Sequence, residues 1–325
     1  MATEFDLIAR FFSRPVAADL LGGGDDCALF KVAPGLQVAT STDLLLEGRH
    51  FFSDVDPRSL GHKALAVNLS DLAAMGARPI GCLLGLALPS IELAWAEQFA
   101  NGFYALADQY GCALLGGDTT RSQQGIALSV TVFGEIDPSL ALRRNAAQVG
   151  DEIWVSGVLG AADVACRMLA GEIATNAELL NATRAALEWP MPRVALGQQL
   201  RALAHAAIDV SDGLLQDLGH ILSASRVGAE LQESQLPVHP ALTGLPPSAL
   251  SADALRRAVL AGGDLYELCF TAPSRHHQQI KNTGVALDLD LSCIGLIRKE
   301  PGLVVYDQAG IAIPQLPLGF DHFRI

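Results

Sequence analysis

The stretch Lys63-Ala-Leu-Ala-Val-Asn-Leu-Ser-Asp-Leu-Ala-Ala-Met-Gly76 decides how this chain is built. Asp56-Pro57 opens a helix before it, and Gly76 is placed to cap that helix after Met75. The stretch is apolar except for a few polar side chains. Lys63 and Asp71 lie on one broad face, because they are eight residues apart with Val67 midway. We therefore predict a long helix over about 56–75 that carries a carboxylate on a largely apolar surface.

Outward from this helix, the first half of the chain alternates between strand-like and helix-like patterns. Apolar, β-prone runs predict strands, and a stripe of aromatic residues at three- and four-residue spacing predicts a second helix. The predicted strands cover residues 37–43, 82–89, 113–118 and 126–136, and the second helix covers about 91–110. This alternation is typical of an α/β domain.

The pattern breaks in the polar segment 143–151, and a new strand begins at Glu152. We place a domain boundary there, which gives an N-terminal domain of residues 1–146 and a C-terminal domain of residues 147–325. The second domain is predicted to contain helices over about 160–171, 193–205 and 212–225, a proline-rich loop over 237–248 and a strand over 265–272. The predicted fold class is α/β, with two mixed domains.

The charge of the chain limits its partners. With a formal net charge of −13 and a pI near 4.9, it lacks the clustered cations that nucleic acids and anionic membranes attract. Only four residues are lysines: Lys31, Lys63, Lys281 and Lys299. A phosphorylated ligand would therefore be held largely by metal ions, arginines or backbone amides.

Cysteine usage and the first residues indicate a cytoplasmic protein. The six cysteines are far apart and form no Cys-x-x-Cys pair, so we expect reduced residues, including a buried Cys27. Glu4 and Asp6 stand where a signal peptide would need positive charge. The apolar stretch beside them is too short to span a bilayer.

Five short acidic motifs carry the expected chemistry. They are Gly24-Asp25-Asp26, Ser41-Thr42-Asp43, Asn68-Leu69-Ser70-Asp71, Gly116-Gly117-Asp118-Thr119-Thr120 and Asp209-Val210-Ser211-Asp212-Gly213. Taken singly, each motif also fits a turn or a helix cap. If their carboxylates converge on one cleft, they repel one another unless cations intervene. Oxygen ligands without a His or Cys cluster favour Mg²⁺ over Zn²⁺.

Several Mg²⁺ ions held in this way would bridge nucleotide phosphates, which is what phosphoryl transfer requires. The chain has neither a Gly-x-x-x-x-Gly-Lys-Ser/Thr loop nor the His-Arg-Asp set of protein kinases. We therefore expect an ATP site of another kind.

The order of these motifs resembles that of the thiamine-monophosphate kinase family. The matching stretches are 23–29, 41–43, 47–51, 63–76, 115–120, 209–213 and 319–323, so the resemblance runs along essentially the whole chain. It implies the fold of aminoimidazole ribonucleotide synthetase, with an N-terminal domain that forms a homodimer and a C-terminal domain that closes over the nucleotide. It also implies the ATP-dependent conversion of thiamine monophosphate to thiamine diphosphate.

The resemblance further implies a role for individual residues. Metal ligands would be Asp26, Ser41, Thr42, Asp43, Asp71, Asp118, Asp209 and Asp212, of which Asp43, Asp71 and Asp212 would be central to catalysis. ATP would contact Gly117, Asp118, Arg144 and Ser211. Thiamine monophosphate would contact His50, Asp264 and Phe320. The family's Gly-Gly-Glu-Asp-Tyr-Glu-Leu appears here as Gly262-Gly263-Asp264-Leu265-Tyr266-Glu267-Leu268, with a shortened carboxylate and a second one removed.

Two alternative functions remain open from the sequence. One is another ATP-using member of the same superfamily. Of these, the hydrogenase-maturation dehydratase needs a C-terminal cysteine, and selenophosphate synthetase needs an early reactive cysteine or selenocysteine. The other alternative is a non-catalytic dimer that binds nucleotide or metal, although such a module would not need so many aspartates.

Overall fold

The predicted long helix is α2 (Pro57–Met75), and nearly all of it is buried. It packs against α3 (Leu93–Tyr110), the predicted second helix. Gly61 on α2 faces the carbonyl of Phe99, and Gly102 on α3 faces the carbonyl of Arg58, so a Cβ at either glycine would overlap backbone. Glycine at both positions therefore lets the two helices approach closely.

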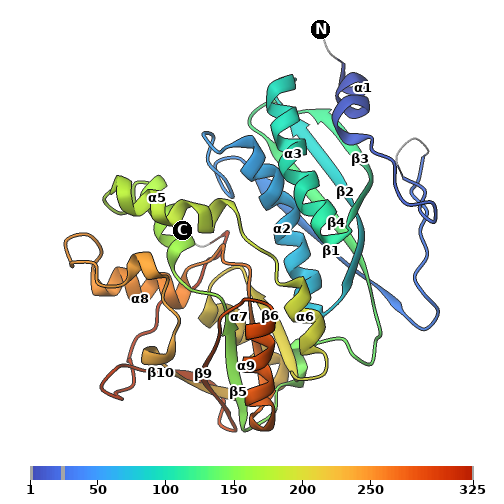
Figure 1. Cartoon of the computed structure of the whole chain (residues 1–325). Helices are drawn as coiled ribbons and strands as arrows, with labels where there is room; N and C mark the ends of the chain where they lie inside the picture. Colours follow the sequence, from blue (N-terminus) through green and yellow to red (C-terminus); the bar gives the residue numbers. More distant parts are fainter. Residues whose placement is uncertain (1–2, 23–25, 324–325) are drawn as a thin grey trace. The chain divides into compact units, whose positions relative to one another are not determined.

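The computed structural model describes residues 3–22 and 26–323, and it divides into two compact units (Figure 1). The first unit comprises residues 1–72 and 77–139, and the second comprises 73–76 and 140–325. Each unit combines helices with one sheet. The predicted pair of mixed α/β domains is confirmed.

The first unit is built on a four-stranded sheet in the order β1-β4-β2-β3. The strands are β1 (Gln37–Leu46), β2 (Arg78–Leu88), β3 (Ala113–Arg121) and β4 (Ala127–Ile136). β2 and β3 are parallel and are joined through α3, whereas β4 runs antiparallel to both of its neighbours. In Figure 1, α2 and α3 lie on the same face of this sheet. A short helix α1 (Glu4–Leu7) continues into a π-helical turn, Ile8–Phe12.

The second unit contains a six-stranded sheet in the order β10-β7-β9-β5-β8-β6. Its strands are β5 (Asp151–Ser156), β6 (Ala206–Val210), β7 (Gly228–Gln232), β8 (Glu267–Pro273), β9 (Leu291–Arg298) and β10 (Gly302–Tyr306). Its α-helices are α4 (Ala161–Leu169), α5 (Ala177–Glu188), α6 (Val194–Leu200), α7 (Leu214–Ser225), α8 (Ala252–Ala261) and α9 (His277–Ala286). A 3₁₀ turn, η2 (Arg144–Ala146), precedes β5.

Two expectations from the sequence are wrong. The helix expected over 193–205 ends at Leu200, after which the chain turns and enters β6 at Ala206. Cys27 is exposed rather than buried, because it lies in an irregular segment outside both sheets. The other five cysteines are buried or half-buried, and all six are free thiols.

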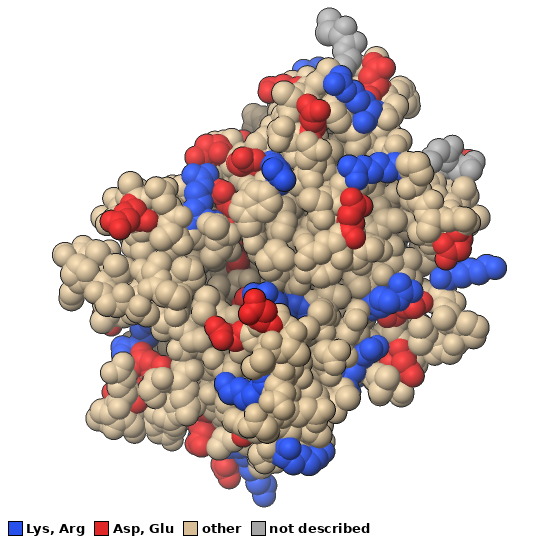
Figure 2. All heavy atoms as spheres, in the orientation of Figure 1, with Lys and Arg blue, Asp and Glu red and all other residues tan. Residues whose placement is uncertain are grey.

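The surface carries mixed charge. On the face drawn in Figure 2, Lys and Arg side chains are interspersed with Asp and Glu. Within residues 3–22 and 26–323, no helix is both long and apolar enough to cross a bilayer.

Candidate active site

Two carboxylates of the first unit face each other across β1 and α2, and we call Asp43 and Asp71 the β1–α2 pair. Ser41, two residues before Asp43 on the same strand, donates a 2.6 Å hydrogen bond from its hydroxyl to Asp71 Oδ2. Burial raises the pKa of Asp43 to about 6, and the negative charge of Asp71 adds to that rise. The pair is therefore an environment in which a bound cation would favour ionised carboxylates.

Asn68 of the Asn68–Asp71 motif, which was given no role of its own from the sequence, helps to hold this pair in place. The Asn68 side chain accepts a 3.0 Å hydrogen bond from the Asp43 backbone N–H and donates to the carbonyl of Ala64. Asn68 is fully buried, so it fixes the strand against the helix. Its place three residues before Asp71, on a helix expected to pack against a strand, is the signal that could have revealed this role.

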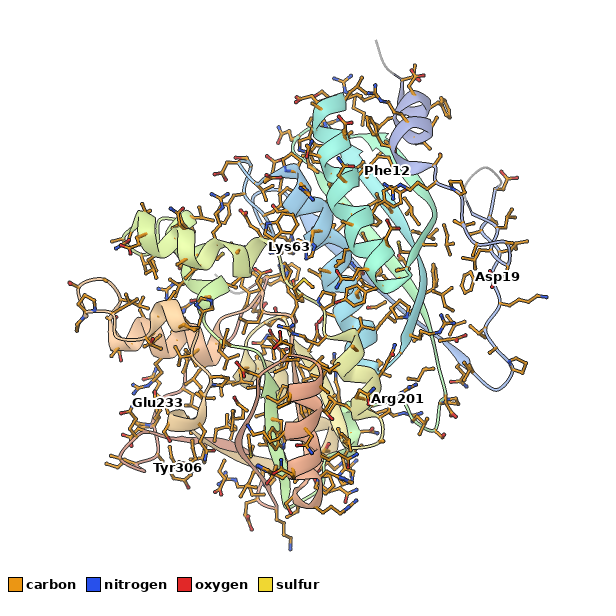
Figure 3. The ribbon with its side chains drawn as sticks, in the orientation of Figure 1. Phe12, Asp19, Lys63, Arg201, Glu233 and Tyr306 are labelled. Atoms are coloured by element: carbon orange, nitrogen blue, oxygen red, sulfur yellow. The ribbon has the colours of Figure 1, made fainter. Side chains whose placement is uncertain are left out.

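Lys63 on α2 also contacts the backbone of His50. Lys63, labelled on α2 in Figure 3, is 3% exposed, and its ammonium group lies 3.4 Å from the carbonyl of His50. His50 Nδ1 accepts a 3.0 Å hydrogen bond from the backbone N–H of Leu46. Because Nδ1 is the acceptor, the proton of a neutral His50 sits on Nε2, which can then donate to a ligand.

Thr42 points away from the β1–α2 pair. Its hydroxyl donates to the carbonyl of Val130 at 3.1 Å and accepts from Thr131 at 2.9 Å. Neighbouring residues of a strand point to opposite faces, so the Thr42 hydroxyl and the Asp43 carboxylate lie on opposite sides of β1. The Thr42 hydroxyl is therefore not placed beside the Asp43 carboxylate.

Asp26 and Asp118 line a different part of the first unit, a pocket of about 760 Å³. Gly117 also lines it, and a Cβ there would overlap the carbonyl of Leu84, so the strand requires glycine. The sheet register aligns Asp118 with Gly85, Ser129 and Leu44. Three strand spacings of this kind amount to roughly 14 Å, so the sheet does not bring Asp118 to the β1–α2 pair. Gly24 and Asp25 of the first motif lie outside the described residues.

In the second unit, the motif Asp209–Gly213 runs from the end of β6 into the turn before α7. Asp217, on the first turn of α7, accepts hydrogen bonds of 3.0–3.1 Å from the backbone N–H groups of Ser211, Asp212 and Gly213. Burial raises the pKa of Asp217 to about 7, although these donors favour its charged form. The sequence analysis did not identify Asp217, because its role depends on the shape of the turn.

The 262–266 loop packs directly on this turn. The backbone N–H groups of Asp264 and Tyr266 donate to the carbonyls of Ser211 and Val210, each at 2.8 Å. Both residues have positive φ angles, 59° and 55°, which non-glycine residues adopt at a cost. Leu265 stands where the family motif has its second carboxylate, and its side chain is buried in this unit.

Glu267 anchors the end of that loop at the start of β8. Its carboxylate accepts a forked pair of hydrogen bonds from Arg193, one of them 2.7 Å long, and another from Ser156. Glu267 is 7% exposed, so the ion pair is largely shielded from water. Glu267 thereby connects β8 to β5 and to the start of α6, next to the strained 262–266 loop.

The last described residues also pack on the turn. The backbone N–H of Phe320 donates to the carbonyl of Asp212 at 3.0 Å, and the Gln216 side chain donates to the carbonyl of Phe320 at 2.7 Å. The Phe320 ring meets His322 edge-on at 4.8 Å. Burial raises the pKa of Asp212, while nearby His322 opposes that rise. Asp212, Ser211, Asp264 and Phe320 are therefore brought together in one site.

Two predicted residues of this unit are placed differently. Asp209 is buried on β6, beside the turn. Arg144 lies at the other end of α7, where its carbonyl accepts from Ser225 at 2.8 Å. A helix of 12 residues is about 18 Å long, so Arg144 is well separated from Asp212.

Each of the two units matches a known family of protein domains. The N-terminal domain model of AIR synthase related proteins matches residues 24–136, and the C-terminal domain model matches residues 148–306. A thiamine-monophosphate kinase of Escherichia coli O157:H7 is 39% identical over 329 residues, which cover 98% of each chain.

Solved structures give the same result. The crystal structure of thiamine-monophosphate kinase from Stenotrophomonas maltophilia K279a is 45% identical, covers 94% of this chain and 95% of its own, and superimposes with a TM-score of 0.83. AaThiL complexed with AMPPCP and TMP is 29% identical, with a TM-score of 0.75 over 90% of this chain and 89% of its own.

Proposed function

This chain belongs to the thiamine-monophosphate kinase family of AIR synthase related proteins, and from that premise we propose that it phosphorylates thiamine monophosphate with ATP to give thiamine diphosphate. It is an ATP-dependent phosphotransferase. The observation that carries the proposal is the β1–α2 pair, in which two carboxylates and the Ser41 hydroxyl share a half-buried position suited to a divalent cation.

We infer that Asp43, Asp71 and Ser41 hold Mg²⁺, with Asp71 as a bridge between ions. The fit rests on the donors, which are hard oxygen atoms, and on the proximity of two carboxylates, since burial and then the charge of Asp71 raise the pKa of Asp43. Bound Mg²⁺ would neutralise charge on the β- and γ-phosphates of ATP. We assign further metal contacts to Asp26, Asp118, Asp209, Asp212 and the backbone carbonyl of Thr42.

The transfer itself requires little acid–base chemistry from the protein. The phosphate of thiamine monophosphate is largely dianionic at neutral pH, so its oxygen attacks the γ-phosphorus in line. A new P–O bond forms as the bond from the γ-phosphorus to the β-phosphate oxygen breaks, and ADP leaves with that electron pair. The role of the chain is to position the two substrates. Gly117, Ser211 and Arg144 are assigned to ATP, with Arg144 on a part of the nucleotide remote from Asp212.

The substrate end is assigned to His50, Asp264 and Phe320. His50 donates from Nε2, because its Nδ1 is already occupied by the Leu46 N–H. Phe320 offers a half-exposed ring to the cationic thiazolium, and the Asp264 carboxylate offers a negative charge. The strained φ of Asp264 is held by the adjacent turn, which fixes the direction of this carboxylate.

We further propose that the chain works as a homodimer in the cytoplasm. Val38, Leu44 and Leu46 alternate on β1 and are 47%, 57% and 39% exposed, which gives an apolar strand face suited to a second copy. Six free thiols fit a reducing compartment. A measured mass of twice 34.2 kDa that falls to one chain in Leu44→Lys would support the dimer, and a monomeric wild type would refute it.

The activity is tested by incubating the pure protein with ATP, Mg²⁺ and thiamine monophosphate and following thiamine diphosphate by chromatography. We expect one diphosphate per ATP consumed, and no product when EDTA removes the metal. Bound ATP without thiamine diphosphate would favour a nucleotide-binding scaffold and reject the kinase.

A further inference from the structure

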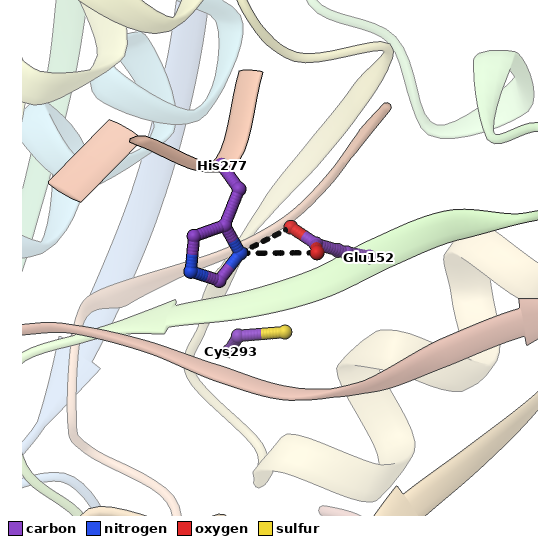
Figure 4. A group of neighbouring side chains, drawn as sticks. All are labelled: Glu152, His277 and Cys293. Atoms are coloured by element: carbon purple, nitrogen blue, oxygen red, sulfur yellow. Dashed lines mark hydrogen bonds and ion pairs between the residues drawn. The ribbon is translucent and has the colours of Figure 1, made fainter. Parts of the chain in front are cut away.

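A second cluster of metal-ligating side chains lies in the second unit, on elements that the proposed kinase chemistry does not use. Glu152 on β5, His277 at the start of α9 and Cys293 on β9 each offer one ligand atom, and these atoms all lie within 4.8 Å of one another (Figure 4). β5 and β9 are neighbouring antiparallel strands, and Trp154 of β5 pairs with Cys293. Three elements remote in sequence therefore place a carboxylate, an imidazole and a thiol together.

The hydrogen bonds already orient two of the three groups. His277 Nδ1 lies 3.0 and 2.9 Å from the two carboxylate oxygens of Glu152, and the indole N–H of Trp154 donates to Glu152 Oε2 at 3.2 Å. The His277 ring also packs on Trp154, with centroids 4.8 Å apart. In metal sites, a side chain that binds the ion is usually oriented by a second hydrogen-bond partner. The Trp154 indole is such a partner for Glu152.

The position is reachable from solvent but not fully exposed. The side chain of Glu152 is 14% exposed and that of His277 is 44% exposed, while Cys293 is half-buried. The Lys281 ammonium group donates to the carbonyl of Leu291 at 2.7 Å, so it is already engaged beside the cluster. An ion could enter beside the imidazole and keep water as a further ligand.

Cys293 completes the donor set with a soft sulfur atom. It lies on β9 opposite Trp154 of the neighbouring strand β5. Its Sγ atom makes a weak contact, 4.0 Å long, with the carbonyl of Gly295. The cluster therefore combines a sulfur, a nitrogen and an oxygen donor within 4.8 Å of one another.

We propose that Glu152, His277 and Cys293 bind one zinc-class divalent ion, with water completing a tetrahedral site. Mixed nitrogen, sulfur and oxygen donors select Zn²⁺ over Mg²⁺, in contrast to the all-oxygen β1–α2 pair. The three ligand atoms lie within 4.8 Å of one another, and an ion bound at about 2.0–2.3 Å from each would draw them closer and replace the hydrogen bond between His277 and Glu152. The ion would tie α9 to the sheet.

The test uses Co²⁺ as a spectroscopic substitute for Zn²⁺ on the full-length protein, with Mg²⁺ in large excess to occupy oxygen sites. We expect one equivalent of Co²⁺ to give the thiolate-to-cobalt charge-transfer band, with competition by Zn²⁺. Cys293→Ser should abolish the band, and His277→Gln and Glu152→Gln should each weaken Co²⁺ binding at least about tenfold. Circular dichroism of each variant checks that it is folded.

The chain offers matched controls for the histidine and for the cysteine. His276→Gln alters the adjacent histidine, Cys166→Ser alters another half-buried cysteine of the same unit, and Cys27→Ser removes the exposed thiol. All three should retain the band and the affinity. The proposal is overturned if millimolar Co²⁺ gives no thiolate band, if the band survives Cys293→Ser, or if folded His277→Gln and Glu152→Gln bind Co²⁺ like the wild type.

Discussion

The β1–α2 pair and Asp217, on the first turn of α7, both lie in or beside short acidic motifs, yet their carboxylates have different partners. Asp43 faces another negative charge, Asp71, across a half-buried gap. Asp217 instead faces three backbone N–H groups, which already supply the positive ends of dipoles. The first arrangement brings two like charges together, where a bound cation would favour the ionised carboxylates, whereas the second uses a carboxylate to shape a turn. The role of a carboxylate therefore depends on its contacts in the folded protein rather than on the sequence motif around it.

The largest effect is expected at the centre of the pair. Asp71→Asn removes a cation ligand while keeping the shape of the side chain, and we expect kcat to fall by at least about 10²–10³-fold, as when a major electrostatic group is lost. The free energy of unfolding should change little, or should rise at neutral pH as the repulsion disappears. Asp108→Asn on α3, an exposed carboxylate, is the matched control and should leave kcat unchanged. Near-normal turnover in Asp71→Asn would remove this residue from the site.

The pH dependence of the pair should come next. Burial, with the negative charge of Asp71, raises the pKa of Asp43 to about 6 in the folded protein, so the metal-free fold is favoured while Asp43 is protonated. That stabilisation is fully present below about pH 4 and is lost as pH rises through about 6, by up to about 3 kcal/mol. Mg²⁺ favours the ionised form, so its stabilising effect should grow over the same range.

Unfolding midpoints at pH 4, 5, 6 and 8, with and without Mg²⁺, measure this dependence. Asp43→Asn should flatten both curves. If the wild type gains equal stability from Mg²⁺ at pH 5 and pH 8, the pair is not where the cation acts.

A smaller loss of stability is expected at the contrasting region. Asp217→Ala leaves buried N–H groups without their acceptor, and we expect the free energy of unfolding to fall by about 2–3 kcal/mol. Activity should fall as well, because Ser211 and Asp212 lose their fixed positions. Denaturant unfolding and kcat are measured together, and Asp217→Asn, which keeps an acceptor oxygen, should be milder. Unchanged stability in Asp217→Ala would show that the three hydrogen bonds do not hold the turn.

The smallest effect is expected at Thr42. Its hydroxyl bonds to Val130 and Thr131 on the side of β1 away from Asp43, so Thr42→Val should change kcat by less than about threefold. Ser41→Ala loses the 2.6 Å hydrogen bond to Asp71 and should be the more damaging of the two. A reversed ranking in the steady-state assay would place the Thr42 hydroxyl among the ligands.

The sequence predicted a helix over about 56–75, which the structure places at Pro57–Met75, because helix periodicity is a local pattern. Strand alternation alone could also have separated the Thr42 hydroxyl from Asp43. The role of Asn68 could have been inferred from its place on a helix expected to pack against a strand. The contacts of Asp217 could not be predicted, since they depend on the shape of the turn before α7. The exposure of Cys27 was missed because an apolar neighbourhood in sequence is not always a buried one in the fold.

The most direct test of the account follows the transferred phosphate itself. ATP labelled on the γ-phosphate is mixed with excess enzyme, thiamine monophosphate and Mg²⁺ for a single turnover, and the products are separated. We predict that the label appears in the terminal phosphate of thiamine diphosphate with the wild type, and that Asp71→Asn leaves it in ATP. Label released only as inorganic phosphate, or equal transfer by Asp71→Asn, would contradict the account.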